Sequence, residues 1–210
     1  MIGTIYLIGG GELRNGDTQL IDTDIKSQAQ KGSTFVFFGS AAQDNTEYAD
    51  TIRSAYGDKY IVIVSTEAKG RDFAIDAIES ADIIYLGGGY TNQLMQLFAR
   101  WGLDEYLRAA IDRGVHVVGM SAGAQALCTW YVHEENDIFE LRKGWGVVPV
   151  GILVHANPVS FDKAKLLWSD NDMSDKYPFI AIEENAAWRV DGQHTSKVGS
   201  GNIWTLSIQK

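Results

Sequence analysis

The hydrophobic pattern alternates between two kinds of segment along the first 120 residues. Short, nearly continuous apolar runs predict strands buried on both faces of a sheet, and the amphipathic stretches between them predict helices that cover it. This alternation predicts a doubly wound α/β fold, with a mostly parallel sheet and helices on both faces. The expected strands are residues 4–8, 34–38, 60–64, 82–86 and 115–120, and the expected helices are residues 18–30, 45–56, 72–79 and 91–113, the last broken near Gly102.

The pattern changes after about residue 129, where turn residues become frequent. With 210 residues and 45% hydrophobic content, the chain can bury one full core, and no linker or repeat interrupts it. We therefore expect a single domain, residues 1–210, with an antiparallel C-terminal extension. The apolar pieces of this half are residues 146–149, 151–155, 179–182, 187–190 and 202–208, and residues 161–168 are expected to be helical.

A sharp corner is predicted where the fifth apolar run meets the helix expected over residues 122–127. Gly119-x-Ser121-x-Gly123 matches the nucleophile-elbow pattern, in which flanking glycines let strand and helix close on each other around a cramped serine. The turn exposes the hydroxyl, and the N–H groups that open the helix, beginning with Ala122, can stabilise an oxyanion. The residues fit a glycine-rich turn with a serine cap equally well, so the pattern alone does not establish catalysis.

Other reactive side chains are expected at the same edge, because open α/β sheets bind ligands where their strands end. His155 follows the apolar residues 151–154, and Glu183 and Glu184 follow residues 179–182. A serine, a histidine and a carboxylate are the three parts of a serine hydrolase. Adjacent residues leaving a strand point in opposite directions, so one of the two glutamates is expected to be solvated.

Two glycine runs have different interpretations. The run of residues 87–89 can supply a second oxyanion donor, from the N–H of Gly88 or Gly89, although it also fits a tight turn. The run of residues 9–11 follows the first strand, but the third glycine of a dinucleotide fingerprint would fall at Arg14. That match fails, and we expect no cofactor.

Composition narrows the partners and the compartment. A formal charge of −9 argues against nucleic acid and anionic membrane surfaces, and no apolar run approaches the length of a bilayer span. The lone cysteine, Cys128, excludes an internal disulfide and is expected to be a buried thiol on the helix after Ser121. Residues 1–4 lack the basic region and cleavage site of a secretory signal, so we expect a cytoplasmic protein. Residues 133–137 depart from the His-Glu-x-x-His zinc pattern, so no metal is expected.

Several of these motifs together resemble one known family. They are residues 8–11, 85–92, 119–124, the Asn136-Asp137 pair, His155 and residues 181–184. The chain resembles the dipeptidase E and cyanophycinase family of serine peptidases, whose fold is similar to the class I glutamine amidotransferase domain. The resemblance covers nearly the whole chain and implies a metal-free Ser-His-Glu or Ser-His-Asp peptidase for short peptides, with Ser121 as nucleophile and His155 as base. Ser121 occupies the position where an amidotransferase has its cysteine.

Two positions compete for the carboxylate of this triad. Asp137 matches an aspartate that has been considered for this position in the family, and Glu184 matches an acidic residue that follows a late strand. We favour Glu184, because a strand end is rigidly placed whereas residues 133–137 are expected to form a polar surface loop.

Substrate binding is expected in the segment of residues 156–168, which follows the histidine. The resemblance implies that family members which cleave after an N-terminal aspartate use an arginine in this segment. Here the segment contains no arginine. Asn157 and Lys163 are the candidates for substrate binding, but lysine cannot imitate a bidentate guanidinium. The sequence therefore argues against aspartyl specificity.

The hypothesis from the sequence is a serine hydrolase, most simply a short-peptide exopeptidase that is a monomer or homodimer. One alternative is a serine esterase or amidase with the same triad, which would hydrolyse acyl esters but no dipeptides. The other is a catalytically silent ligand-binding module, which would form no covalent adduct with a serine-directed reagent.

Overall fold

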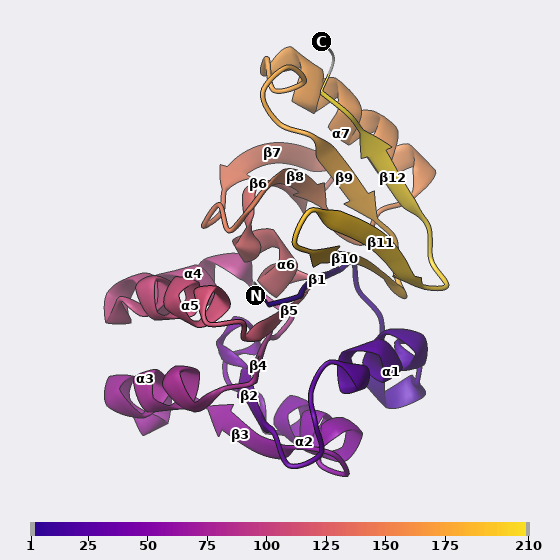
Figure 1. The fold of residues 1–210 in the computed structure, drawn as a ribbon. Coiled ribbons are helices and arrows are strands. Elements are labelled where there is room, and N and C mark those ends of the chain that lie inside the picture. The colour runs from indigo at the N-terminus through magenta and orange to yellow at the C-terminus, as the bar shows by residue number, and fades with distance from the viewer. Residues whose placement is uncertain (1–2, 209–210) are drawn as a thin grey trace.

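The computed structural model describes residues 3–208, which contain two β-sheets (Figure 1). In the described part of the chain, the larger sheet has seven strands in the order β11-β10-β1-β5-β4-β2-β3. Its strands are β1 (Ile5–Ile8), β2 (Thr34–Phe38), β3 (Ile61–Ser65), β4 (Ile83–Leu86), β5 (His116–Met120), β10 (Ala186–Asp191) and β11 (His194–Gly199). The five strands β1 to β5 are parallel, and β10 runs antiparallel to β1. The doubly wound α/β fold expected from the pattern is confirmed.

The smaller sheet has five strands within the described residues, in the order β12-β9-β8-β6-β7. Strands β6, β8 and β9 are parallel, whereas β7 and β12 pair antiparallel at the two edges. The expected antiparallel C-terminal extension is therefore present and is divided between the sheets. The bounds are β6 (Cys128–Glu135), β7 (Ile138–Lys143), β8 (Val148–Leu153), β9 (Phe179–Ile182) and β12 (Ile203–Leu206).

Helices cover both faces of the larger sheet, as Figure 1 shows. One apolar cluster joins this sheet to α3, α4, α5 and α6, and a second joins the opposite face to α1 and α2. A third cluster packs α7 on the smaller sheet. The bounds are α1 (Gln19–Ser27), α2 (Thr46–Tyr56), α3 (Arg71–Ser80), α4 (Thr91–Trp101), α5 (Leu103–Asp112), α6 (Ala122–Leu127) and α7 (Pro158–Asp170), with short 3₁₀ helices at η1 (Leu13–Asn15), η2 (Ser40–Ala42) and η3 (Glu67–Lys69).

Helix α6 follows the predicted corner and lies against both sheets. All six of its residues are buried, and it contacts strands of both sheets. Small side chains such as Ala122, Ala124 and Ala126 let it lie this close to its neighbours. The residue just before it, Ser121, is consequently placed at the junction between the two sheets.

The prediction of a polar surface loop at residues 133–137 was wrong. Strands β6 and β7 form a hairpin in which Glu135 lies opposite Ile138, joined by Asn136 and Asp137 with φ values of 52° and 63°. Two consecutive residues with positive φ are typical of a two-residue hairpin turn, and Asn and Asp tolerate this conformation. The expected helical position of Cys128 was also wrong, because the helix ends at Leu127 and Cys128 begins β6 as a buried thiol.

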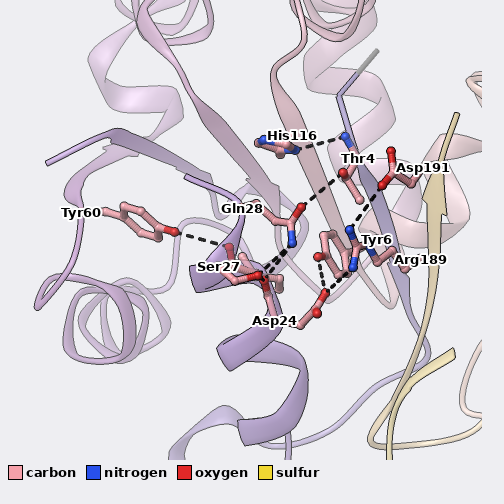
Figure 2. Close-up of polar contacts among 10 residues, drawn as sticks. Thr4, Tyr6, Asp24, Ser27, Gln28, Tyr60, His116, Arg189 and Asp191 are labelled. Carbon is pink, nitrogen blue, oxygen red and sulfur yellow. Dashed lines mark hydrogen bonds and ion pairs between the residues drawn. The ribbon is translucent and has the colours of Figure 1, made fainter. Parts of the chain in front are cut away.

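A polar cluster joins β1, α1, β5 and β10 at the end of the larger sheet where β1 and β5 begin (Figure 2). The hydroxyl of buried Tyr6 donates to Asp24, which also lies 3.5 Å from Arg189. The N–H of Thr4 donates to Nδ1 of His116 at 3.1 Å, and burial lowers the pKa of that histidine. The sequence assigned no role to His116, and these contacts connect elements of the fold at the end of β1 opposite Ser121.

Among residues 3–208, no helix is both long enough and apolar enough to cross a bilayer. Met1 and Ile2, on which part of the expectation about a secretory signal rested, lie outside the described residues.

Candidate active site

The corner predicted at Ser121 is present between β5 and α6. Ser121 has φ 49° and ψ −103°, a backbone conformation that residues other than glycine rarely adopt. The flanking glycines are required by close approach: a Cβ at Gly119 would lie 2.6 Å from the backbone N of Ala124, and one at Gly123 would lie 2.3 Å from the carbonyl oxygen of Leu86. The elbow pattern in the sequence thus reflects real steric limits.

Three side chains distant in sequence meet at this corner. The Oγ of Ser121 lies 2.7 Å from Nε2 of His155, and Nδ1 of His155 lies 2.5 Å from Oε1 of Glu184. If the neutral imidazole carries its proton on Nδ1, that N–H donates to Glu184 while Nε2 accepts from the serine hydroxyl. Both His155 and Glu184 are half-exposed, so the group is open to a ligand from solvent.

The end of β1 holds all three segments in place through its backbone. The carbonyl oxygens of residues 8, 9 and 10 accept, in order, the N–H groups of Ser121 at 2.9 Å, His155 at 3.0 Å and Asn185 at 3.0 Å. These bonds fix the corner after β5, the end of β8 and the loop after β9 against one strand. The convergence of the side chains therefore depends on the backbone of β1.

Gly10 gives the glycine run at residues 9–11 a steric role. A Cβ at this position would lie 2.3 Å from Oε2 of Glu184 and 2.5 Å from Nδ1 of His155. Contacts this short require one side chain to move, and the imidazole and the carboxylate are the groups that can do so. The run makes room for the His155–Glu184 pair.

We predict that Gly10→Ala will lower kcat on a peptide substrate by about 100-fold, because displacements of about 1 Å at a reacting group have effects of this size. Circular dichroism should show a folded protein. Gly16→Ala is the control: Gly16 also has a positive φ, of 77°, but a Cβ there meets nothing within 4 Å. Equal losses of kcat in the two variants would contradict a specific role for Gly10.

The two glutamates after β9 point to different partners. Glu184 contacts His155, whereas Oε2 of Glu183 accepts from the N–H and the side-chain amide of Asn202 at 2.7 and 2.8 Å. This follows the alternation expected where a strand ends. The competing Asp137 lies at the hairpin turn with its side chain 84% exposed, paired to Lys163 at 3.1 Å. The structure places Glu184 against the imidazole and gives Asp137 another partner.

The predicted oxyanion donors differ in what they already bind. The N–H of Gly88 donates to the hydroxyl of Tyr48 at 3.2 Å. Gly89 lines the cleft that contains Ser121 and His155. The N–H of Ala122 lies in the first turn of α6, where backbone donors have no intrahelical acceptor. Gly89 and Ala122 are therefore better placed than Gly88.

A cleft of about 540 Å³ opens beside the serine. Its walls are residues 89–92 at the start of α4, the corner at Ser121, the β6–β7 hairpin and the end of β8. This volume is in the range of small-molecule sites. The hairpin supplies much of the wall, and it is the part of the site that the sequence prediction missed; its signal was the Asn136-Asp137 pair between two runs of strand-forming residues.

Buried Gln125 connects three of these walls. Its Oε1 accepts from the hydroxyl of Thr91 at 2.5 Å, and its Nε2 donates to the carbonyl oxygen of Val132 at 3.2 Å. These bonds join the start of α4 and strand β6 to α6. A buried amide with both ends bonded holds its neighbours rigidly, since losing either bond leaves an unsatisfied polar group.

The two candidates for substrate binding in the segment after His155 have other roles in the structure. The side chain of Asn157 caps α7 by accepting from the N–H groups of Val159 and Ser160, each at 3.0 Å. Lys163 pairs with Asp137, and neither Asn157 nor Lys163 lines the cleft. Asn157 precedes a helix start that needs an acceptor, and α7 packs on the outer face of the smaller sheet, so the structure gives both side chains partners outside the cleft.

Comparison with known protein families identifies the family of this chain. Residues 5–198 match the model of the family described as Peptidase family S51. The chain belongs to peptidase family S51. The resemblance to dipeptidase E, which the sequence motifs indicated, is thereby confirmed.

Relatives of the S51 chain include proteins named as peptidases in several bacteria. It is 32% identical over 136 residues to the uncharacterized peptidase YgaJ of Bacillus subtilis. This aligned segment covers 63% of this chain and 58% of that protein. It is 34% identical over 96 residues to Peptidase E of Haemophilus influenzae, covering 45% and 43%. With Peptidase E of Streptomyces coelicolor it shares 30% identity over 178 residues, covering 77% and 69%. The matched segments thus span about half the length of the first two relatives.

Two solved structures share the fold of the S51 chain. A peptidase from an acI-B1 Actinobacterium superposes with a TM-score of 0.69 at 20% identity, covering 100% of this chain and 92% of that one. A Peptidase E-like protein from Listeria monocytogenes superposes with a TM-score of 0.70 at 19% identity, covering 95% and 100%. At these identities the likeness concerns the fold.

Proposed function

We propose that this S51 protein is a serine peptidase that hydrolyses short peptides through Ser121, His155 and Glu184. The observation that carries the proposal is the continuous chain of contacts from Ser121 Oγ through both ring nitrogens of His155 to Glu184, at 2.7 and 2.5 Å. Distances of this kind are within the range for proton transfer from a nucleophile to a base that is itself oriented by a third group.

Each residue then has one role in the proposed reaction. His155 accepts the hydroxyl proton as Ser121 Oγ attacks the scissile carbonyl carbon, forming a tetrahedral intermediate whose oxyanion is held by the N–H groups of Ala122 and Gly89. His155 then donates that proton to the leaving amine, and the acyl-enzyme is hydrolysed by water in a second, equivalent sequence. Glu184 keeps the imidazole oriented and stabilises its charged form without itself becoming protonated.

The size and the polarity of the cleft support short substrates. A volume of about 540 Å³ accommodates a few residues of peptide, and polar side chains from the hairpin line it. A dipeptidase or other exopeptidase is the simplest activity for such a site. The segment after His155 contains no arginine, which argues against aspartyl specificity of the kind that the family resemblance suggested.

A serine-directed probe tests this proposal together with a peptide panel. The wild-type protein should react with a fluorophosphonate, with the adduct mapped to Ser121 by mass spectrometry, and should hydrolyse some members of a dipeptide library with varied first residue. An adduct with turnover of acyl esters but no dipeptide would indicate an esterase. The absence of both adduct and turnover would instead indicate a ligand-binding module and contradict the proposal.

A further inference from the structure

The cleft-facing side of the β6–β7 hairpin carries charged groups in a defined order. In the antiparallel register Tyr131 lies opposite Arg142, and His133 lies opposite Glu140. Tyr131, His133 and Arg142 line the cleft, whereas the alternate residues Phe139 and Leu141 pack in the apolar cluster with α7. Period-two alternation therefore gives the hairpin one apolar face and one polar face, and the polar face is turned toward Ser121.

Among the lysine and arginine residues that the structure describes, Arg142 alone lines this cleft. Its Nη2 and Nε lie 2.8 and 3.3 Å from the same oxygen of Glu140, which leaves Nη1 outside the pair. Hydrogen bonding to Glu140 raises the pKa of the guanidinium further, so its charge is permanent. Because both partners are well exposed, the ion pair itself contributes little, and it serves mainly to orient the guanidinium.

The other charges of the cleft lie at the opposite end of the hairpin. Glu134 and Glu135 line the cleft close to the turn, at the third and fourth positions along β6 after Tyr131, the residue opposite Arg142. The cleft thus has a cationic end and an acidic end. Free short peptides carry one carboxylate and one ammonium group at neutral pH, and this separation of charge matches them.

We propose that Arg142 binds a carboxylate of the peptide substrate, supplied by its C-terminus or by an acidic side chain. The inference rests on the proposed peptidase function of the same cleft. A guanidinium presents two parallel N–H donors to a carboxylate, which a lysine at the same position would not. The Tyr131 side chain lies close enough to Arg142 for the guanidinium to lower the pKa of its hydroxyl, opposing the larger effect of burial, so the two groups stand side by side in the cleft wall.

Binding can be measured without turnover in a Ser121→Ala background, by chemical-shift titration with three peptides. Alanyl-alanine offers a C-terminal carboxylate, aspartyl-alanine amide offers only a side-chain carboxylate, and alanyl-alanine amide offers neither. Adding Arg142→Gln should weaken the binding of one of the two carboxylate-bearing peptides by about 10- to 100-fold and leave the binding of alanyl-alanine amide unchanged. The peptide whose binding is weakened shows whether Arg142 binds the C-terminal carboxylate or a side-chain carboxylate. Equal effects on all three peptides, or no effect on any, would overturn the proposal.

Two further variants separate charge and geometry from general damage. Arg142→Lys should recover only part of the lost affinity, since it keeps the charge but not the fork. Arg53→Gln is the matched control, because Arg53 is an exposed arginine paired to Asp50 on α2, away from the cleft. If Arg142 discriminates among the peptides while the wild-type protein hydrolyses none and resists the fluorophosphonate, the proposed function fails, whereas the carboxylate-binding site at Arg142 stands. If hydrolysis is normal but the discrimination is absent, the reverse holds.

Discussion

Replacing Ser121 with alanine is expected to lower kcat/KM on a dipeptide substrate by about ten thousand- to a million-fold and to abolish fluorophosphonate labelling. Losses of this size are typical when the nucleophile of a Ser-His-acid triad is removed, and the activity that survives comes from the oxyanion donors and substrate binding. The change deletes one oxygen at a partly exposed corner, and alanine is no more strained than serine at this φ of 49°. The thermal unfolding midpoint should therefore stay close to that of the wild type.

Ser40→Ala is a suitable control for that variant. Ser40 also follows a strand of the larger sheet at its carboxyl end, and among the described residues its buried hydroxyl has no hydrogen-bond partner. Its removal should leave both labelling and kcat/KM unchanged. Retention of peptidase activity in Ser121→Ala, after contaminating peptidases are excluded, would show that another group performs the attack.

Replacing Glu184 with glutamine is expected to reduce kcat by about a thousand- to ten thousand-fold. Glutamine keeps the size of the side chain but removes the negative charge that stabilises the imidazolium, and its NH₂ group can face Nδ1 and favour the unproductive tautomer. Asp137→Asn should change kcat little, because Asp137 is 84% exposed and pairs with Lys163 rather than with the histidine. Steady-state kinetics on one dipeptide compares the two variants directly.

Glu183→Gln provides the matched control beside Glu184. Glu183 belongs to the same strand end but accepts its hydrogen bonds from Asn202, so its neutralisation should affect loop stability more than kcat. A larger loss of kcat in Asp137→Asn than in Glu184→Gln would assign the third triad position to the aspartate. It would also require the hairpin to move on substrate binding.

Much of the site could be predicted because its parts follow directly from local rules. Residues buried on both faces of a parallel sheet form continuous apolar runs, so β1 to β5 were located to within a residue or two at each end. The elbow has a local sequence pattern because Gly119 and Gly123 are in steric contact with residues near them along the chain or on the next strand. His155 and Glu184 were found because strand ends of an α/β sheet share one edge.

The rest could not be predicted because it depends on contacts between distant segments. The strands β6, β7 and β11 contain charged residues on their exposed face, so their apolar signal is weak, and the hairpin was taken for a loop. Asn157 and Lys163 were placed in the site by their nearness to His155 in sequence, whereas α7 turns away from it. Arg142 precedes His155 by one strand and reaches the cleft only through the pairing of β7 with β6.

The sequence alone determined the α/β fold, the corner at Ser121 and the set of strand ends at which a base and a carboxylate could stand, because periodicity and the steric need for glycine are local properties. Only the tertiary structure decided that Glu184 rather than Glu183 or Asp137 meets the imidazole, that Gly10 leaves space for that pair, and that Arg142 faces the cleft. Those outcomes depend on register and on close approach between segments far apart along the chain, which no local pattern records.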